Sequence, residues 1–142
     1  MRSSCRFAMA VHVLAVLAYK KGGAVTSSFL AQSVNTNPVI IRRLLLTLQK
    51  ANLVETRKGA GYGSSLKGAP GKIRLSDIYR AVEEEEPFVL PRQKPNENCP
   101  VGQCIQKALS QVFTSAEEAL ERELSRTSLA DILGAVKGCV EE

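Results

Sequence analysis

The alternation of apolar and polar positions is clearest between Asn35 and Asn52, where it predicts one amphipathic helix. Apolar residues recur at intervals of three and four, at Ile41, Leu44, Leu45 and Leu48. Polar turn and cap residues precede this helix, and Pro38 stands where a first helical residue is expected. The opposite side carries Val39, Arg42, Arg43, Gln49 and Lys50. Such a side fits a DNA groove, but it also fits a helix with merely solvated arginines, so the neighbouring segments decide.

Two helical segments precede this one. A largely apolar run ending at Lys21, which Ser3 and Ser4 can cap, predicts a core helix. A short helix over 26–34 follows, capped by Thr26 and Ser27, and we expect its apolar residues to face inward: Phe29, Leu30 and Val34. Two short helices joined by a tight polar turn, the second basic on its exposed side, predict a helix-turn-helix.

The segment after Asn52 predicts a β-hairpin wing. Residues 53–58 resemble a strand, residues 59–71 are rich in Gly, Ser, Ala and Pro, and residues 72–75 form a second short run that alternates basic and apolar positions. We expect four side chains here to reach DNA: Arg57, Lys58, Tyr62 and Lys67. The glycines do not form a nucleotide-binding P-loop, since the G-K-[ST] ending and the strand-to-helix setting are missing.

The C-terminal part predicts a pairing surface. A short helix begins at Ser76 and Asp77, a Pro-rich loop covers 84–98, and a long amphipathic helix runs from Cys99 to about Arg126. This helix is too long to be covered by one small domain, so we expect it to pair with a second copy through Ile105, Leu109, Val112, Ala116, Leu120 and Leu124. A short closing helix over 128–133 follows, and the tail from Gly134 shows no clear pattern.

Together these segments predict a mainly α fold with a small β-hairpin wing. We divide the chain into a winged helix-turn-helix DNA-binding domain (1–83), a Pro-rich linker loop (84–98) and a dimerisation helix with its C-terminal tail (99–142).

Charge strengthens the DNA interpretation. The 142 residues are 44% hydrophobic, enough for a core, and carry a net charge of +5. Residues 1–80 hold 13 Lys/Arg against 2 Asp/Glu, whereas residues 81–142 hold 6 against 12. A basic part joined to an acidic part is expected when the first faces a polyanion. A protein–protein adaptor on the same fold would not need this charge.

The sequence argues against an enzyme and against a membrane protein. It contains no nucleophile–base pair, no metal-ligand spacing and no Cys-x-x-Cys motif in a βαβ setting. We find no secretory signal and no apolar run long enough to span a bilayer, so we expect a cytoplasmic protein. We assign no role to His12, Cys5 or Cys139.

At this point the chain resembles the Rrf2 family of bacterial winged-helix regulators. The similarity covers nearly the whole chain, and NPVIIRRLL followed by a glycine-rich wing is its most specific part. The stretch NENCPVGQCIQKAL looks most like the YwnA-like branch.

The resemblance implies a homodimeric, sequence-specific DNA-binding regulator, usually a repressor. Matching positions imply contacts from Ser27, Ser28, Asn37, Pro38, Val39, Arg42 and Arg43, and on the wing from Arg57, Lys58, Tyr62 and the segment from Ser64 to Lys67. Of these, Arg42 or Arg43 is expected at a base edge or a close phosphate. The target genes, the operator, the effector and the direction of regulation do not follow from the sequence.

The cysteines depart from the cluster-binding members of this family. Those members carry three cysteines in the loop before the long helix, whereas here the region holds Cys99 and Cys104, and the expected third position falls near Gln93. We therefore predict no cofactor and no metal, with an iron–sulfur or metal-responsive regulator as the alternative.

Cys99 stands at the predicted cap of the long helix, where unpaired backbone N–H groups favour a reactive thiol. Cys104 lies about 140° further round an ideal helix, so a relaxed bridge between the two is not expected. Both are candidates for thiol-based redox sensing, which leaves three interpretations open: a small, partly buried structural pair, thiol sensing, and metal or cluster binding.

Overall fold

Helices dominate the residues that the computed structural model describes, which are 5–20, 23–58 and 62–141. In chain order they are α1 (Arg6–Tyr19), α2 (Ser27–Val34), α3 (Pro38–Lys50), the short 3-10 helix η1 (Pro70–Lys72), α4 (Leu75–Val82), α5 (Pro100–Ser125) and α6 (Leu129–Glu141). Strands β1 (Val54–Arg57) and β2 (Gly63–Leu66) form an antiparallel hairpin in which Val54 pairs with Leu66 and Arg57 with Gly63. The predicted mainly helical fold with a small hairpin wing is confirmed. The predicted cap residues Ser3 and Ser4, and the predicted helix end Lys21, lie outside the described residues.

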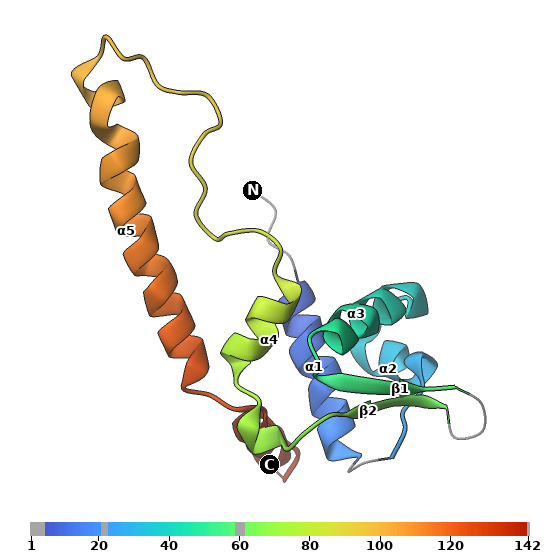
Figure 1. Cartoon of the computed structure of the whole chain (residues 1–142). Coiled ribbons are helices and arrows are strands. Elements are labelled where there is room, and N and C mark those ends of the chain that lie inside the picture. The colour runs from blue at the N-terminus through green and yellow to red at the C-terminus, as the bar shows by residue number, and fades with distance from the viewer. Residues whose placement is uncertain (1–4, 21–22, 59–61, 142) are drawn as a thin grey trace.

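The core forms around α1, which contacts α2, α3, α4, α6 and β2 (Figure 1). Five of its residues are buried, and they meet the apolar sides of the surrounding helices. Phe7 also packs edge-on against Tyr79 of α4, with ring centroids 5.3 Å apart. The helix-turn-helix is thereby held on one side of α1.

The turn between α2 and α3 is closed by backbone geometry and caps. Thr26 caps α2 by accepting a hydrogen bond from the backbone N–H of Phe29 at 3.1 Å, as predicted. Asn35 adopts a left-handed conformation (φ 64°) that ends α2, and the N–H of Thr36 donates to the carbonyl of Ala31. Phe29 itself is 43% exposed, with the Lys20 ammonium 4.7 Å from its ring centroid, so the expectation that it faces inward is wrong.

The second wing strand differs from the prediction. It is formed by residues 63–66, inside the segment expected to be a glycine-rich loop. In the expected second strand, 72–75, Lys72 ends η1 and Leu75 begins α4. The physical reason is a close approach: the backbones of Ser64 and Val25 exchange two hydrogen bonds of 2.8 Å, and a Cβ on Gly63 would lie 2.8 Å from the Val25 carbonyl oxygen. Small residues are needed there, so the strand lacks the β-branched residues that usually mark one.

The C-terminal helix also differs from the prediction, because α6 continues through Gly134 to Glu141. Ser128 and Asp131 begin it with a reciprocal pair of hydrogen bonds, in which each side chain accepts from the other residue's backbone N–H (2.9 and 3.1 Å). Leu129 is fully buried in the core and Leu133 packs against it. The predicted segment 99–142 is therefore two parts, of which α6 belongs with the winged domain.

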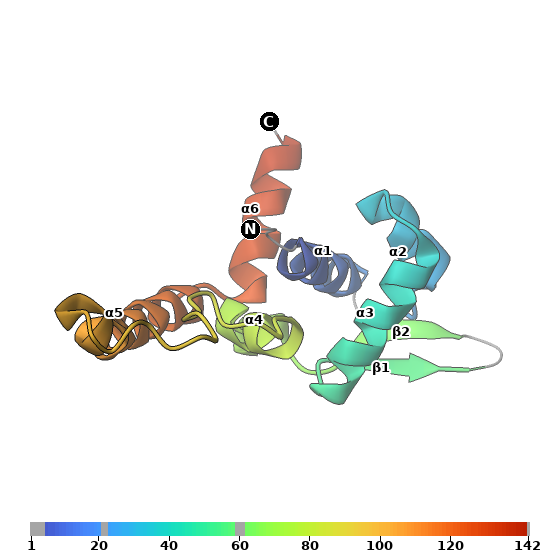
Figure 2. The same ribbon diagram turned by 90° about the horizontal axis from the view of Figure 1, so that it is seen from above.

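The long helix α5 extends away from that domain (Figure 1). Viewed from above, α5 and the wing lie on opposite sides of α1 and α4 (Figure 2). α5 contacts the rest of the described chain mainly through α4 and through the stacked rings of Phe88 and Phe113, whose centroids are 5.3 Å apart. None of its 26 residues is buried.

Candidate nucleic-acid interface

α3 is oriented by its own sequence. The Asn37 side-chain oxygen accepts a hydrogen bond from the backbone N–H of Val39 at 2.8 Å, and Pro38 occupies the first turn, so the helix starts where predicted. Its buried side consists of the four predicted residues, Ile41, Leu44, Leu45 and Leu48. The outer side therefore exposes Val39, Arg42, Arg43, Gln49 and Lys50, as expected.

A groove runs between α3, the start of α2 and the wing, with a volume of about 430 Å³. Of the predicted DNA-contacting residues, it brings together Ser27, Arg42, Arg57, Lys58, Tyr62 and Ser64. These residues come from three segments up to 37 positions apart in the sequence. The helix-turn-helix and the wing thus present one continuous surface, which we call the wing groove.

The wing groove is basic. No acidic residue lines it, and within the described ranges Arg42, Arg57 and Lys58 make no ion pair with a carboxylate. Ser27, Gln49 and Thr56 add hydrogen-bonding groups to its walls. Three unpaired cations beside hydroxyl and amide groups are the chemistry that holds a phosphodiester backbone.

The two adjacent arginines of α3 lie in different surroundings. Arg42 lines the wing groove, whereas Arg43 borders a separate hollow that faces α1 and also contains Arg6, Thr47 and Glu84. Successive residues of a helix are about 100° apart, which explains the separation. The sequence left the choice between Arg42 and Arg43 open, and only Arg42 shares a surface with the wing.

Two predicted wing contacts make hydrogen bonds within the protein. Ser64 is 2% exposed and its hydroxyl shares a hydrogen bond of 3.2 Å with Thr56, so its side chain is too buried for the predicted DNA contact. Lys67 lies at the base of the wing, where its ammonium donates to the Asn52 side chain at 2.6 Å. Ser28, by contrast, is exposed at the start of α2, close to Ser27.

Sequence reasoning missed Leu46, which also lines the wing groove and is 60% exposed. The signal was available, because Leu46 lies two positions from both Leu44 and Leu48 and therefore falls outside the buried stripe of α3.

The cysteine segment packs tightly at the start of α5. The N–H of Cys99 donates to the Asn96 carbonyl at 3.2 Å, and the Asn96 side chain accepts from the N–H of Asn98 at 2.9 Å. A Cβ on Gly102 would overlap the same Asn96 carbonyl oxygen, so glycine is required there. The tight packing against Asn96 thus explains the glycine in the motif around Cys99. Both Cys99 and Cys104 are free and exposed.

These residues do not fit an iron–sulfur cluster on their own. A cluster needs about four thiolate or substitute ligands. In the part of the chain that the structure describes, no three His, Cys, Asp or Glu side chains are grouped so that they could hold a metal ion. His12 lies on α1, where its Nε2 is 2.9 Å from the hydroxyl of Ser33.

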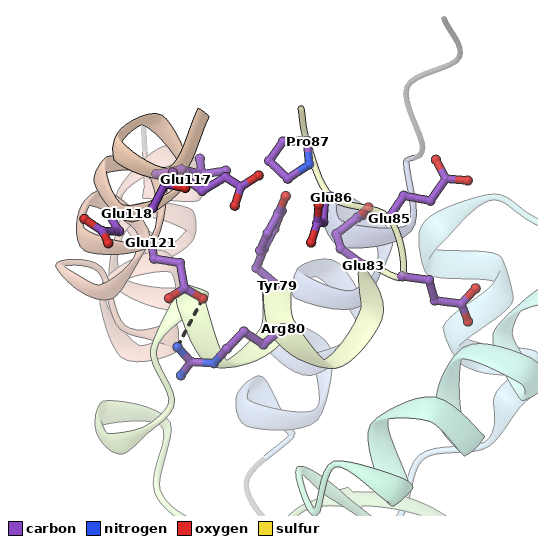
Figure 3. Close-up of a pocket in the computed structure, with 12 residues that line it drawn as sticks. Tyr79, Arg80, Glu83, Glu85, Glu86, Pro87, Glu117, Glu118 and Glu121 are labelled. Atoms are coloured by element: carbon purple, nitrogen blue, oxygen red, sulfur yellow. Dashed lines mark hydrogen bonds and ion pairs between the residues drawn. The ribbon is translucent and has the colours of Figure 1, made fainter. Parts of the chain in front are cut away.

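An acidic cleft separates α4 and residues 83–87 from α5 (Figure 3). Burial raises the pKa of Tyr79 in this cleft above its ordinary value of 10.0, and the negative charges of Glu83, Glu117 and Glu121 raise it further. The Arg80 guanidinium offsets part of that charge by pairing with Glu121 at 3.3 Å. The acidic half of the chain therefore forms a surface distinct from the wing groove.

The geometry defines the class of protein: a winged helix-turn-helix with a basic recognition surface, which is a DNA-binding architecture. The chain matches the Rrf2 family, whose description is "Iron-dependent Transcriptional regulator", over residues 3–135. This chain therefore belongs to the Rrf2 family of transcriptional regulators, as the sequence resemblance indicated.

Individual relatives agree with this assignment. The chain is 41% identical over 128 residues to YwnA of Bacillus subtilis (strain 168), named as a candidate HTH-type transcriptional regulator, with 90% of this chain and 94% of YwnA covered. A crystal structure of a candidate DNA-binding protein superposes with a TM-score of 0.73 at 40% identity, covering 90% of this chain and 98% of that one. A candidate transcriptional regulator from Lactobacillus plantarum gives a TM-score of 0.78 at 25% identity, covering 94% and 90%.

These relatives are regulators rather than enzymes, which confirms the expectation that this chain is not an enzyme. In the described ranges, every helix is too short or too polar to cross a lipid bilayer.

Proposed function

We propose that this chain is a homodimeric repressor that places its two α3 helices on two operator half-sites. Two observations carry the proposal: a basic wing groove, and an amphipathic helix of which no residue is buried by its own chain. Two identical recognition helices at a fixed separation match a palindromic DNA site.

Support for the dimer comes from the apolar stripe of α5. Val112 is 61% exposed and Val101 66% exposed, and they stand on the same side of the helix, close to Ile105 and Ala116. A run of apolar side chains this long on one exposed helix face is typical of a helix that pairs with another copy.

The dimer is tested by placing a charge in the stripe. Val112→Glu should shift the molar mass in solution from dimer to monomer and weaken operator binding at least tenfold, because the two half-sites are no longer engaged together. Gln111→Glu adds the same carboxylate on the neighbouring, polar side of α5 and should change neither quantity. A Val112→Glu protein that stays dimeric would show that the pairing surface lies elsewhere.

DNA binding is tested by salt titration with the DNA upstream of the protein's own gene. A regulator that neutralises several phosphates loses affinity steeply as salt rises, with a slope of about −0.9 per phosphate contacted. A protein–protein adaptor on the same fold would show weak binding with no sequence preference. A reporter gene under the same DNA then separates repression from activation, since loss of the protein should raise its expression.

Modification of Cys99 is the regulatory step of this proposal. An oxidant such as diamide takes two electrons and two protons from the Cys99 thiol and a second thiol, and an S–S bond forms between the two sulfurs. The second thiol belongs to another copy or to a small thiol, since Cys104 lies further round the helix. The new bond displaces the exposed start of α5 and changes the separation of the two recognition helices.

Three samples test the thiol step: reduced protein, diamide-treated protein and diamide-treated Cys99→Ser. We expect diamide to weaken operator binding by the wild-type protein about tenfold. Diamide-treated Cys99→Ser should bind as tightly as the reduced wild-type protein. Equal affinity in all three samples would sink the redox proposal while leaving the DNA-binding function intact. A visible absorption band after anaerobic purification would instead favour the iron–sulfur alternative, with ligands supplied in part from outside this segment.

A further inference from the structure

The exposed side of α3 has an apolar centre. Val39 is 41% exposed and Leu46 is 60% exposed. They are seven positions apart, which places both on one line along the helix, two turns from each other. The cationic residues of α3 stand on either side of this line, with Arg42 on the flank that faces the wing groove and Arg43 on the other.

A single exposed leucine on a protein surface is ordinary and needs no explanation. Here two apolar side chains share the one face that carries the recognition cations, and Leu46 forms part of the wing groove wall beside Arg42 and Tyr62. Leu44, Leu45 and Leu48 already bury the other side of the helix, so Val39 and Leu46 add nothing to the core. Their surface is free to contact a ligand.

Base edges in the major groove offer one apolar group that such side chains fit. Thymine presents a C5-methyl group there, whereas the edges of guanine, adenine and cytosine present hydrogen-bonding atoms. We propose that Val39 and Leu46 contact thymine methyl groups of the operator half-site, so that α3 recognises methyl-bearing positions along its centre. This inference rests on the proposed DNA-binding function and adds the chemical class of base that the helix selects.

Helix geometry limits where those thymines lie. Seven residues correspond to a rise of about 10.5 Å along α3. Successive base pairs are about 3.4 Å apart, so the two methyl groups lie no more than about three base-pair steps apart. A tilt of the helix across the groove shortens this spacing.

The test removes methyl groups without changing base pairing. First, the full chain selects a duplex from a random-sequence pool. The selected duplex is then synthesised as a series in which one thymine at a time is replaced by deoxyuridine. At one or two positions in each half-site we expect deoxyuridine to weaken binding about fourfold, the effect of one buried methyl group. Leu46→Ala should bring the thymine-to-deoxyuridine affinity ratio at one of these positions to about one, and Val39→Ala should do so at another.

Lys50→Ala provides the matched control, because Lys50 lies on the same exposed side and carries a charge instead of an apolar group. Lys50→Ala should weaken binding to the thymine and the deoxyuridine duplexes equally, and it should reduce the slope of affinity against salt by about one. Deoxyuridine duplexes that bind wild-type protein as tightly as thymine duplexes would overturn the inference, as would Leu46→Ala and Val39→Ala proteins that keep the wild-type ratios. Failure to select any duplex would overturn the DNA-binding proposal itself, which is a separate result.

Discussion

Helices α3 and α5 both have proline in the first turn, and each carries an apolar stripe, but the two stripes differ in what covers them. The stripe of α3 is buried by its own chain, whereas none of the α5 residues is buried. The same amphipathic pattern therefore completes a core in one helix and leaves an incompletely covered surface in the other. Periodicity identifies the apolar side of a helix, but only the rest of the fold shows whether that side is already satisfied.

The largest effect is expected on the exposed side of α3. Arg42→Ala together with Arg43→Ala should abolish specific DNA binding, a loss of about thirtyfold or more, since each contact of this type contributes about 1–3 kcal/mol. The proposed dimer should remain intact, because neither residue lies near α5. Binding by fluorescence anisotropy and molar mass in solution measure the two properties.

The single variants sharpen this expectation. Arg42→Ala should account for most of the loss, since only Arg42 shares the wing groove with Arg57 and Lys58. Operator affinity retained in the double variant would mean that another face of α3 meets the DNA.

The apolar sides of the two helices should respond very differently to truncation. Leu48→Ala in α3 should lower the free energy of unfolding by about 2–5 kcal/mol, because Leu48 is fully buried. Val112→Ala in α5 should change it by less than about 0.5 kcal/mol at concentrations where the chain is monomeric. Urea unfolding measures both, and equal losses would show that α5 is covered within one chain after all.

A smaller loss in the free energy of unfolding is expected where the wing packs against Val25. Gly63→Ala should cost about 1–3 kcal/mol, since Gly63 has φ +137° and an added Cβ would press on the Val25 carbonyl oxygen. Gly71 offers a matched control, because an added Cβ there meets nothing within 4 Å. Hydrogen exchange of the Ser64 and Val25 amides should accelerate in Gly63→Ala and not in Gly71→Ala.

The smallest effect is expected at the start of α6, where Asp131 and Ser128 form the cap. Hydrogen bonds from Ser128 hold the pKa of Asp131 below its ordinary value of 3.8. A lowered folded-state pKa gives stability that is present above the unfolded value and is lost as the pH falls through the folded one. Asp131→Asn should therefore unfold slightly more easily than wild type at neutral pH, and the difference should shrink as the pH falls through the lowered pKa of Asp131. A constant difference at every pH would show that the charge plays no part.

Much of the fold follows from local signals in the sequence. Thr26, Asn37 and Pro38 fix the starts of α2 and α3, and Pro100 fixes the start of α5. β2 was not predictable, because the close approach of Gly63 to Val25 depends on a contact between distant segments. The length of α6 was hidden by Gly134 and Gly138, which lower helix propensity, while burial of Leu129 offsets that cost.

The interface was predictable in outline but not in detail. The basic side of α3 and the wing residues Arg57 and Lys58 were identified from their position and charge alone. The burial of Ser64 and the hydrogen bond between Lys67 and Asn52 depend on the strand register, which the sequence did not reveal. The sequence could not separate Arg42 from Arg43, because the choice depends on which side of α3 the wing packs.

The attachment of α5 has a mechanical consequence. Its C-terminal end is fastened to the winged domain by two backbone hydrogen bonds, from Leu75 to Thr127 at 2.9 Å and from Leu129 to Ile73 at 2.8 Å. The other end, about 39 Å away along the helix, carries Cys99. A rigid rod of this length amplifies motion, so a turn of about 5° at the fastened end moves the far end by about 3 Å. Under the proposed thiol step the same geometry works in reverse, because fixing the Cys99 end would limit the angles that α3 can adopt relative to α5.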